Sequence, residues 1–82
     1  MNLVRSIGLL LKGADVITEI GIAAGDIWHY LDEKGAATLD QLAQYIKKDR
    51  NLLLMSLGWL AREGHITLGN AQSGYRATLS GH

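Results

Sequence analysis

The sequence predicts a small, mainly helical α+β domain, with a three-helix core, a β-hairpin after the last helix and an additional N-terminal amphipathic helix. Residues 38–64 have the pattern of two helices joined by a short polar turn, and residues 65–79 follow as strand, turn and strand. With 82 residues, 48% of them apolar, the chain suits one globular domain with a modest core. We assign residues 1–18 to an amphipathic extension, residues 19–80 to the domain and residues 81–82 to a tail.

Charge and composition limit the function classes. Eight Lys and Arg residues balance eight Asp and Glu residues, so net charge gives no general attraction to nucleic acid. The second half is mildly basic, because residues 41–82 hold five bases against two acids. The chain has no cysteine, which excludes disulfides and thiolate metal sites. No stretch has the length and apolarity of a signal peptide or a membrane span, so we expect a cytoplasmic protein.

The N-terminal extension carries an apolar stripe at helical spacing. Leu3, Ile7 and Leu10 recur at intervals of four and three residues. The segment is either a loosely attached leader or a helix that is stable only when this face is buried. We favour the second interpretation, because so many Leu and Ile side chains are costly to leave in water.

Residues 20–33 are predicted to form the first helix of the domain, and Lys34-Gly35 ends it. His29 lies on its polar side at helical spacing from Asp26 and Glu33. Such a group can be a metal site or an acid–base pair, but more commonly it is a solvated helix face. We favour the solvated face.

Capping signals delimit the next two helices. Thr38 and Gln41 have the spacing of a capping box, so a helix should begin at Leu39. Asp49 is a good N-cap for the following helix, and Gly64 is expected just beyond its end. The apolar positions at helical spacing are Leu39, Leu42, Ala43 and Ile46 in the first helix, and Leu53, Leu57 and Leu60 in the second.

The remaining elements are predicted to be strands. Residues 65–68 and 75–79 are predicted to be short strands on either side of Gly69–Gly74, which is predicted to be the turn of the hairpin. Residues 36–38 are predicted to form a short strand that pairs with this hairpin.

These elements resemble the winged helix-turn-helix superfamily, in which the hairpin is the wing. The resemblance is carried by Gln41-Leu42-Ala43, Leu53, Leu57, Leu60, Gly64 and Ile66. Over residues 19–79 the chain is also similar to a small bacterial and archaeal winged-helix family of unknown function. The matching residues are Ile20-Gly21, Ala24-Gly25, Ile27-Trp28 and residues 57–63. The resemblance implies the fold, and it adds DNA binding as the common function of the superfamily.

The second helix of the pair departs from a base-reading helix. With Leu53, Leu57 and Leu60 on the inside, its outward face is Asn51, Met55, Gly58 and Arg62, flanked by Leu54 on one side and by Leu52 and Trp59 on the other. Leu52, Leu54, Met55 and Gly58 thus stand where a DNA reader carries polar and basic side chains. Leu and Met have no hydrogen-bonding groups for base edges beyond weak sulfur contacts. We therefore expect this face to meet protein, either the N-terminal segment of the same chain or a second copy. The predicted interface residues are Leu3, Ile7, Leu10, Leu52, Leu54, Met55 and Trp59.

Two functions follow from this reading. The first is a non-enzymatic protein-interaction and homodimerisation module. The alternative is a DNA-binding transcriptional regulator that holds the backbone of duplex DNA weakly, through contacts with phosphates. The candidate phosphate contacts are Lys47, Lys48, Arg50, Asn51 and Arg76. No residue pattern points to catalysis, a cofactor, a metal or a small-molecule substrate.

Overall fold

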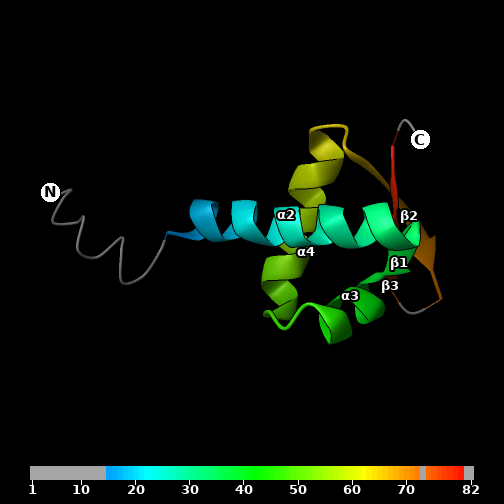
Figure 1. Ribbon diagram of the computed structural model, residues 1–82, viewed down its shortest axis with the longest axis horizontal. Coiled ribbons are helices and arrows are strands. Elements are labelled where there is room, and N and C mark those ends of the chain that lie inside the picture. Colours follow the sequence, from blue (N-terminus) through cyan, green and yellow to red (C-terminus); the bar gives the residue numbers. More distant parts are fainter. Residues whose placement is uncertain (1–14, 73, 81–82) are drawn as a thin grey trace, which may run out of the picture.

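The computed structural model describes residues 15–72 and 74–80. In this part of the chain the elements are α2 (Val16–Lys34), β1 (Ala36–Thr38), α3 (Leu39–Tyr45), α4 (Arg50–Arg62), β2 (Ile66–Ala71) and β3 (Gly74–Leu79). Figure 1 shows α2 lying across α4, with the sheet beside the C-terminal end of α2. The predicted architecture is confirmed: three helices and a three-stranded antiparallel sheet form a winged helix-turn-helix.

The first helix begins earlier than residues 20–33 predict. Asp15 is its N-cap, with extended backbone angles, and its Oδ1 accepts a hydrogen bond from the Thr18 amide at 2.8 Å. The predicted start at Ile20 was therefore wrong. A capping Asp accepts from one of the free N–H groups of the first turn, so the helix begins at the residue that follows Asp15. The additional N-terminal helix falls mostly outside the described residues, and its last part, residues 16–18, is the first turn of α2.

The helix-turn-helix is delimited by the predicted caps. Thr38 and Gln41 form a reciprocal capping box, with backbone-to-side-chain distances of 2.8 and 3.1 Å. Asp49 Oδ2 accepts from two amides of the first turn of α4, at 3.0 and 3.2 Å.

The end of α4 has the geometry of a Schellman motif. Gly64 has a φ of +82°, and the His65 amide donates to the Leu60 carbonyl at 2.9 Å. The Gly64 amide donates to the Ala61 carbonyl at 3.1 Å. These bonds satisfy carbonyl groups that the helix end would leave open.

The sheet has the order β1-β3-β2, so the short strand at residues 36–38 pairs with the hairpin as predicted. The predicted turn, Gly69–Gly74, was too long. Pairing continues to Ala71 opposite Gly74, so Gly69, Asn70, Ala71 and Gly74 belong to the strands. Gly and Asn are poor strand formers, but the hydrogen bonds to β3 hold Gly69 and Asn70 in the ladder.

Small side chains let α2 pack closely on α4. Ala23 and Ala24 are buried on α2, and Ser56 is buried on α4. Ser56 Oγ lies 2.8 Å from the Leu52 carbonyl oxygen and 3.3 Å from the Ile20 carbonyl oxygen, so its single hydrogen is shared between the two helices. The largest fully buried apolar side chains of the described core are Ile27, Leu31, Leu42, Leu53 and Leu57.

The cap of α4 provides the first testable prediction. Replacing Asp49 by Ala should lower the free energy of unfolding by about 0.5–2 kcal/mol, because two amides lose their acceptor. Urea denaturation measures the change. Asp49→Asn is the matched control and should be close to the native protein, since Asn caps as well as Asp. Equal stability of the Ala variant would show that the cap contributes nothing.

Candidate functional site

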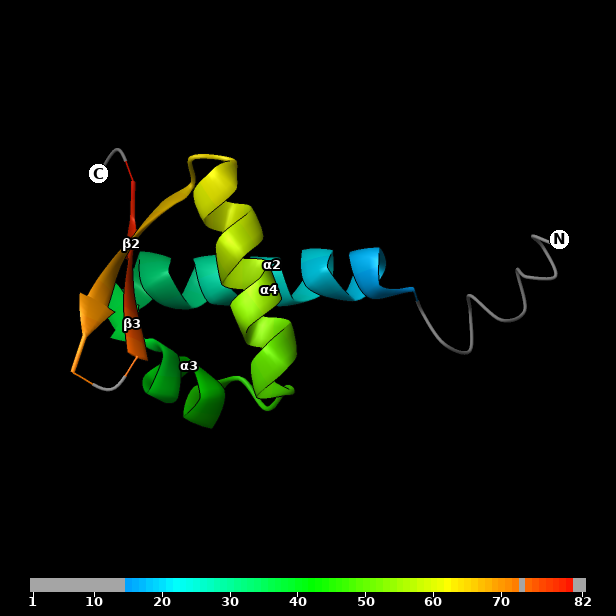
Figure 2. The same cartoon turned by 180° about the vertical axis from the view of Figure 1, so that it is seen from behind.

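The outward side of α4 exposes several large apolar side chains. Leu53, Leu57 and Leu60 are buried, as predicted, so the opposite side of the helix faces solvent. Leu54 is 36% exposed, and Met55 is 45% exposed. We call Leu54, Met55 and Trp59 the outer face of α4; Leu54 and Trp59 lie on its two flanks, and Asn51, Gly58 and Arg62 are also exposed between them. Figure 2 shows α4 in front of α2, with β2 and β3 to one side of it.

The flank of α4 nearest α2 is partly covered. Leu52, predicted to lie beside the outer face, is half-buried and packs against the core. Trp59 is 47% exposed, and its ring centroid lies 6.3 Å from that of His65. Trp59 also borders a shallow, mostly apolar groove of about 290 Å³. The other lining residues are Gly21, Ala24, Gly25, Trp28, Leu60 and His65.

One of the candidate phosphate contacts, Arg50, forms an ion pair with a carboxylate. Arg50, the first residue of α4, places its guanidinium 2.8 Å from the carboxylate of Asp40 on α3. Both side chains are about half exposed, so the pair adds little to stability. A phosphate would nevertheless have to compete with this carboxylate for Arg50.

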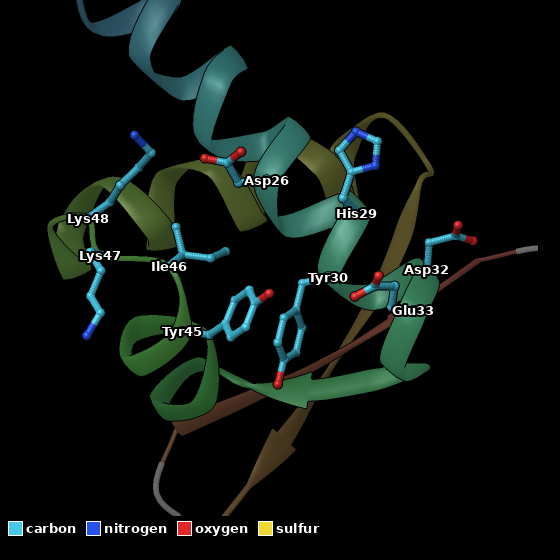
Figure 3. Close-up of a pocket in the computed structure, with 9 residues that line it drawn as sticks. All are labelled: Asp26, His29, Tyr30, Asp32, Glu33, Tyr45, Ile46, Lys47 and Lys48. Atoms are coloured by element: carbon cyan, nitrogen blue, oxygen red, sulfur yellow. The ribbon is translucent and has the colours of Figure 1, made fainter.

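Lys47 and Lys48 line a different part of the surface. They border an open hollow of about 670 Å³ that α2 and the α3–α4 turn form together. Figure 3 shows the two lysines on one side, the α2 residues His29, Asp32 and Glu33 on the other, and a pair of tyrosine rings between them. Three carboxylates line the same hollow, because Asp26 also borders it. This mixed charge makes the hollow a poor site for a polyanion.

His29 lies in this hollow with the carboxylates that flank it in the sequence. Across residues 15–72 and 74–80, no three His, Cys, Asp or Glu side chains gather closely enough to hold a metal ion. Asp26, His29 and Glu33 are all exposed on α2.

The last two candidate phosphate contacts lie on two different elements, α4 and β3. Asn51 is exposed in the first turn of α4. Arg76 is exposed on β3, opposite Thr38 of β1 and Gly69 of β2. It is the one basic residue within the described parts of β2 and β3. The five candidates therefore lie at the start of α4, on the α3–α4 turn beside carboxylates, and on β3. One of them, Arg50, is already paired with Asp40.

Exposed apolar side chains also lie at the N-terminal end of α2, whose first turn was predicted to belong to the amphipathic extension. Val16 is 52% exposed, Ile17 is 76% exposed and Ile22 is 55% exposed. Both views show this end of α2 projecting beyond α4. Asp15, three residues before Thr18, was the signal for this longer helix. Within the described chain, no helix combines the length and apolarity required to cross a membrane.

Comparisons with known proteins agree with this geometry. A family model described as a winged helix-turn-helix domain (DUF2582) matches residues 15–77. An uncharacterized protein of Methanocaldococcus jannaschii, MJ1608, is 40% identical over 55 residues, which cover 63% of this chain and 77% of the relative. The solution NMR structure of protein BT2368 from Bacteroides thetaiotaomicron is similar with a TM-score of 0.67 at 26% identity, over 78% of each chain.

Proposed function

The chain belongs to the DUF2582 family of winged helix-turn-helix domains, and we propose that it is a non-enzymatic protein-interaction module that forms a homodimer through the outer face of α4. The observation that carries the proposal is the exposure of Leu54, Met55 and Trp59 on one helix. Soluble monomers seldom leave several large apolar side chains together in water.

The chemistry of this face favours protein over DNA. In the major groove, bases are read through hydrogen-bond donors and acceptors; Leu54 has neither, and Met55 has only a weakly accepting thioether sulfur. Each such side chain gains roughly 1.5–3 kcal/mol when it is fully buried. A second copy supplies the same apolar face, and a two-fold axis brings the two faces together.

DNA binding is the second candidate, supported by the fold and by the exposed bases near the start of α4 and on β3. In that function Lys47, Lys48, Arg50, Asn51 and Arg76 would contact phosphates, and Arg50 would do so in competition with Asp40. Binding through phosphates alone is weak and independent of sequence.

The proposed dimer predicts a change in mass with one substitution. Sedimentation at micromolar concentration should give a dimer for the native chain and a folded monomer for Leu54→Asp, because a carboxylate cannot enter an apolar contact unpaired. Gln44→Asp, an exposed position on α3, is the control and should stay dimeric. A native chain that sediments as a monomer at these concentrations contradicts the proposal.

A second prediction separates the two functions. The affinity of the chain for duplex DNA should be weak, equal for all sequences and steeply reduced by salt, because each neutralised phosphate releases counterions. Replacing Lys47, Lys48 and Arg76 by Ala should weaken all duplexes alike. A selection over random duplexes is the measurement. Recovery of one site that is bound about a thousandfold more tightly than bulk DNA would support the regulator instead.

A further inference from the structure

Each of the two crossing helices, α2 and α4, contains exposed glycine within its length. Gly21 and Gly25 lie inside α2, and Gly58 lies inside α4. Glycine is among the least favourable residues inside a helix. A Cβ atom added at any of the three would meet nothing within 4 Å, so packing within the described chain does not require them. What they do provide is room for another molecule to approach the two helix backbones closely.

Two of these glycines line the groove that Trp59 borders. At 100° per residue, Gly21, Gly25 and Trp28 fall within about 60° of one another around α2, next to the buried Ala24. Trp59 lines the same groove from α4, and the described lining residues include no Lys, Arg, Asp or Glu. We call this recess the α2–α4 groove.

The shape of the α2–α4 groove suits an apolar side chain of another protein. Small-molecule sites enclose roughly 300–1,000 Å³ and bury most of their ligand. This groove is shallow and holds about 290 Å³. Large aromatic side chains that enter such recesses are frequent anchors of protein interfaces. We therefore look for the occupant among the exposed aromatic residues of a protein partner.

The proposed dimer needs more surface than the outer face of α4 provides. At their exposed fractions, Leu54, Met55 and Trp59 together offer on the order of 200 Å². A stable interface buries about 800 Å² on each partner. The contact therefore has to extend beyond these three side chains. Trp59 belongs both to the outer face and to the border of the groove, so the groove continues the same apolar surface onto α2.

We propose that Trp59 of each copy enters the α2–α4 groove of the other copy and packs against Gly21 and Gly25. This inference rests on the proposed dimer. A two-fold axis that runs between Trp59 and the two glycines, in the plane of contact, brings each indole onto the glycines of the other copy. The missing side chains let the ring lie against the α2 backbone. Gly58, next to Trp59, leaves the neighbouring part of α4 equally open to approach.

Isotope-filtered nuclear Overhauser spectra test this contact directly. In a sample of mixed labelled and unlabelled native chains, the filtered spectrum reports only contacts between copies. The indole protons of Trp59 should show cross-peaks to the α-protons of Gly21 or Gly25 of the other copy. Sedimentation of the native chain at micromolar concentration measures the oligomeric state independently.

The two measurements separate the groove contact from the dimer on which it rests. A dimer without these cross-peaks overturns the groove contact, leaves the proposed dimer standing and frees the groove for a different occupant. A monomer at micromolar concentration overturns both proposals.

A substitution that fills the α2–α4 groove extends the test. Gly25→Leu should raise the dissociation constant of the dimer roughly tenfold or more, because the added side chain occupies the space that the indole needs. Circular dichroism should show the native helix content, since Leu favours a helix over Gly and the space around the Cβ atom is open. Gly25→Ala should weaken the dimer in the same direction, but less.

Gln44→Leu is the matched control for this substitution. It adds the same side chain at an exposed position on α3, so the dissociation constant of the dimer should be unchanged. A Gly25→Leu dimer as tight as the native dimer, or tighter, would show that nothing from the second copy enters the groove, and the proposal would be wrong.

Discussion

The close crossing of α2 on α4 is the contact on which the rest of the structure depends. Ala23, Ala24 and Ser56 are small enough for the two helices to approach, and the serine hydroxyl bridges their carbonyl oxygens. The crossing turns Leu53 and Leu57 of α4 into the core, and it therefore turns Leu54 and Met55 outward. It also leaves the first turn of α2 projecting beyond the core, with its apolar face uncovered by any described residue.

The apolar and charged surfaces of the molecule contribute unequal energies. Exposed ion pairs such as that of Arg50 and Asp40 contribute roughly 0–1 kcal/mol, whereas burial of one Leu or Met side chain contributes roughly 1.5–3 kcal/mol. The scattered bases therefore offer a weak and general attraction to phosphate, and the outer face of α4 offers a larger gain to an apolar partner. For this reason we place protein interaction before DNA recognition.

Local patterns allowed much of the fold to be predicted. Thr38, Gln41, Asp49 and Gly64 act through neighbours within a few residues, so their caps could be read from spacing alone. The early start of α2 was equally local, in Asp15, and was missed because the apolar stripe at Ile20 took precedence. The length of the hairpin depended on cross-strand pairing, which short apolar runs do not reveal.

The candidate site was less predictable, because it depends on where separate elements meet. The pairing of Arg50 with Asp40, and the carboxylates of α2 beside Lys47 and Lys48, follow from the packing of α2, α3 and α4. Helical periodicity identified Leu54 and Met55 as outward-facing, but it also placed Leu52 there, which packing draws half inward. Ser56 shows the reverse case, a polar residue that the crossing buries.

The methyl resonance of Met55 tests the central claim most directly. The chain has two methionines, at positions 1 and 55, so methyl-labelled methionine reports on the outer face of α4 with little overlap. If this face binds a second copy, the Met55 signal should change on dilution through the micromolar range and stay constant when duplex DNA is added. A signal that is constant on dilution but shifts with duplex DNA would contradict the claim and place DNA on α4.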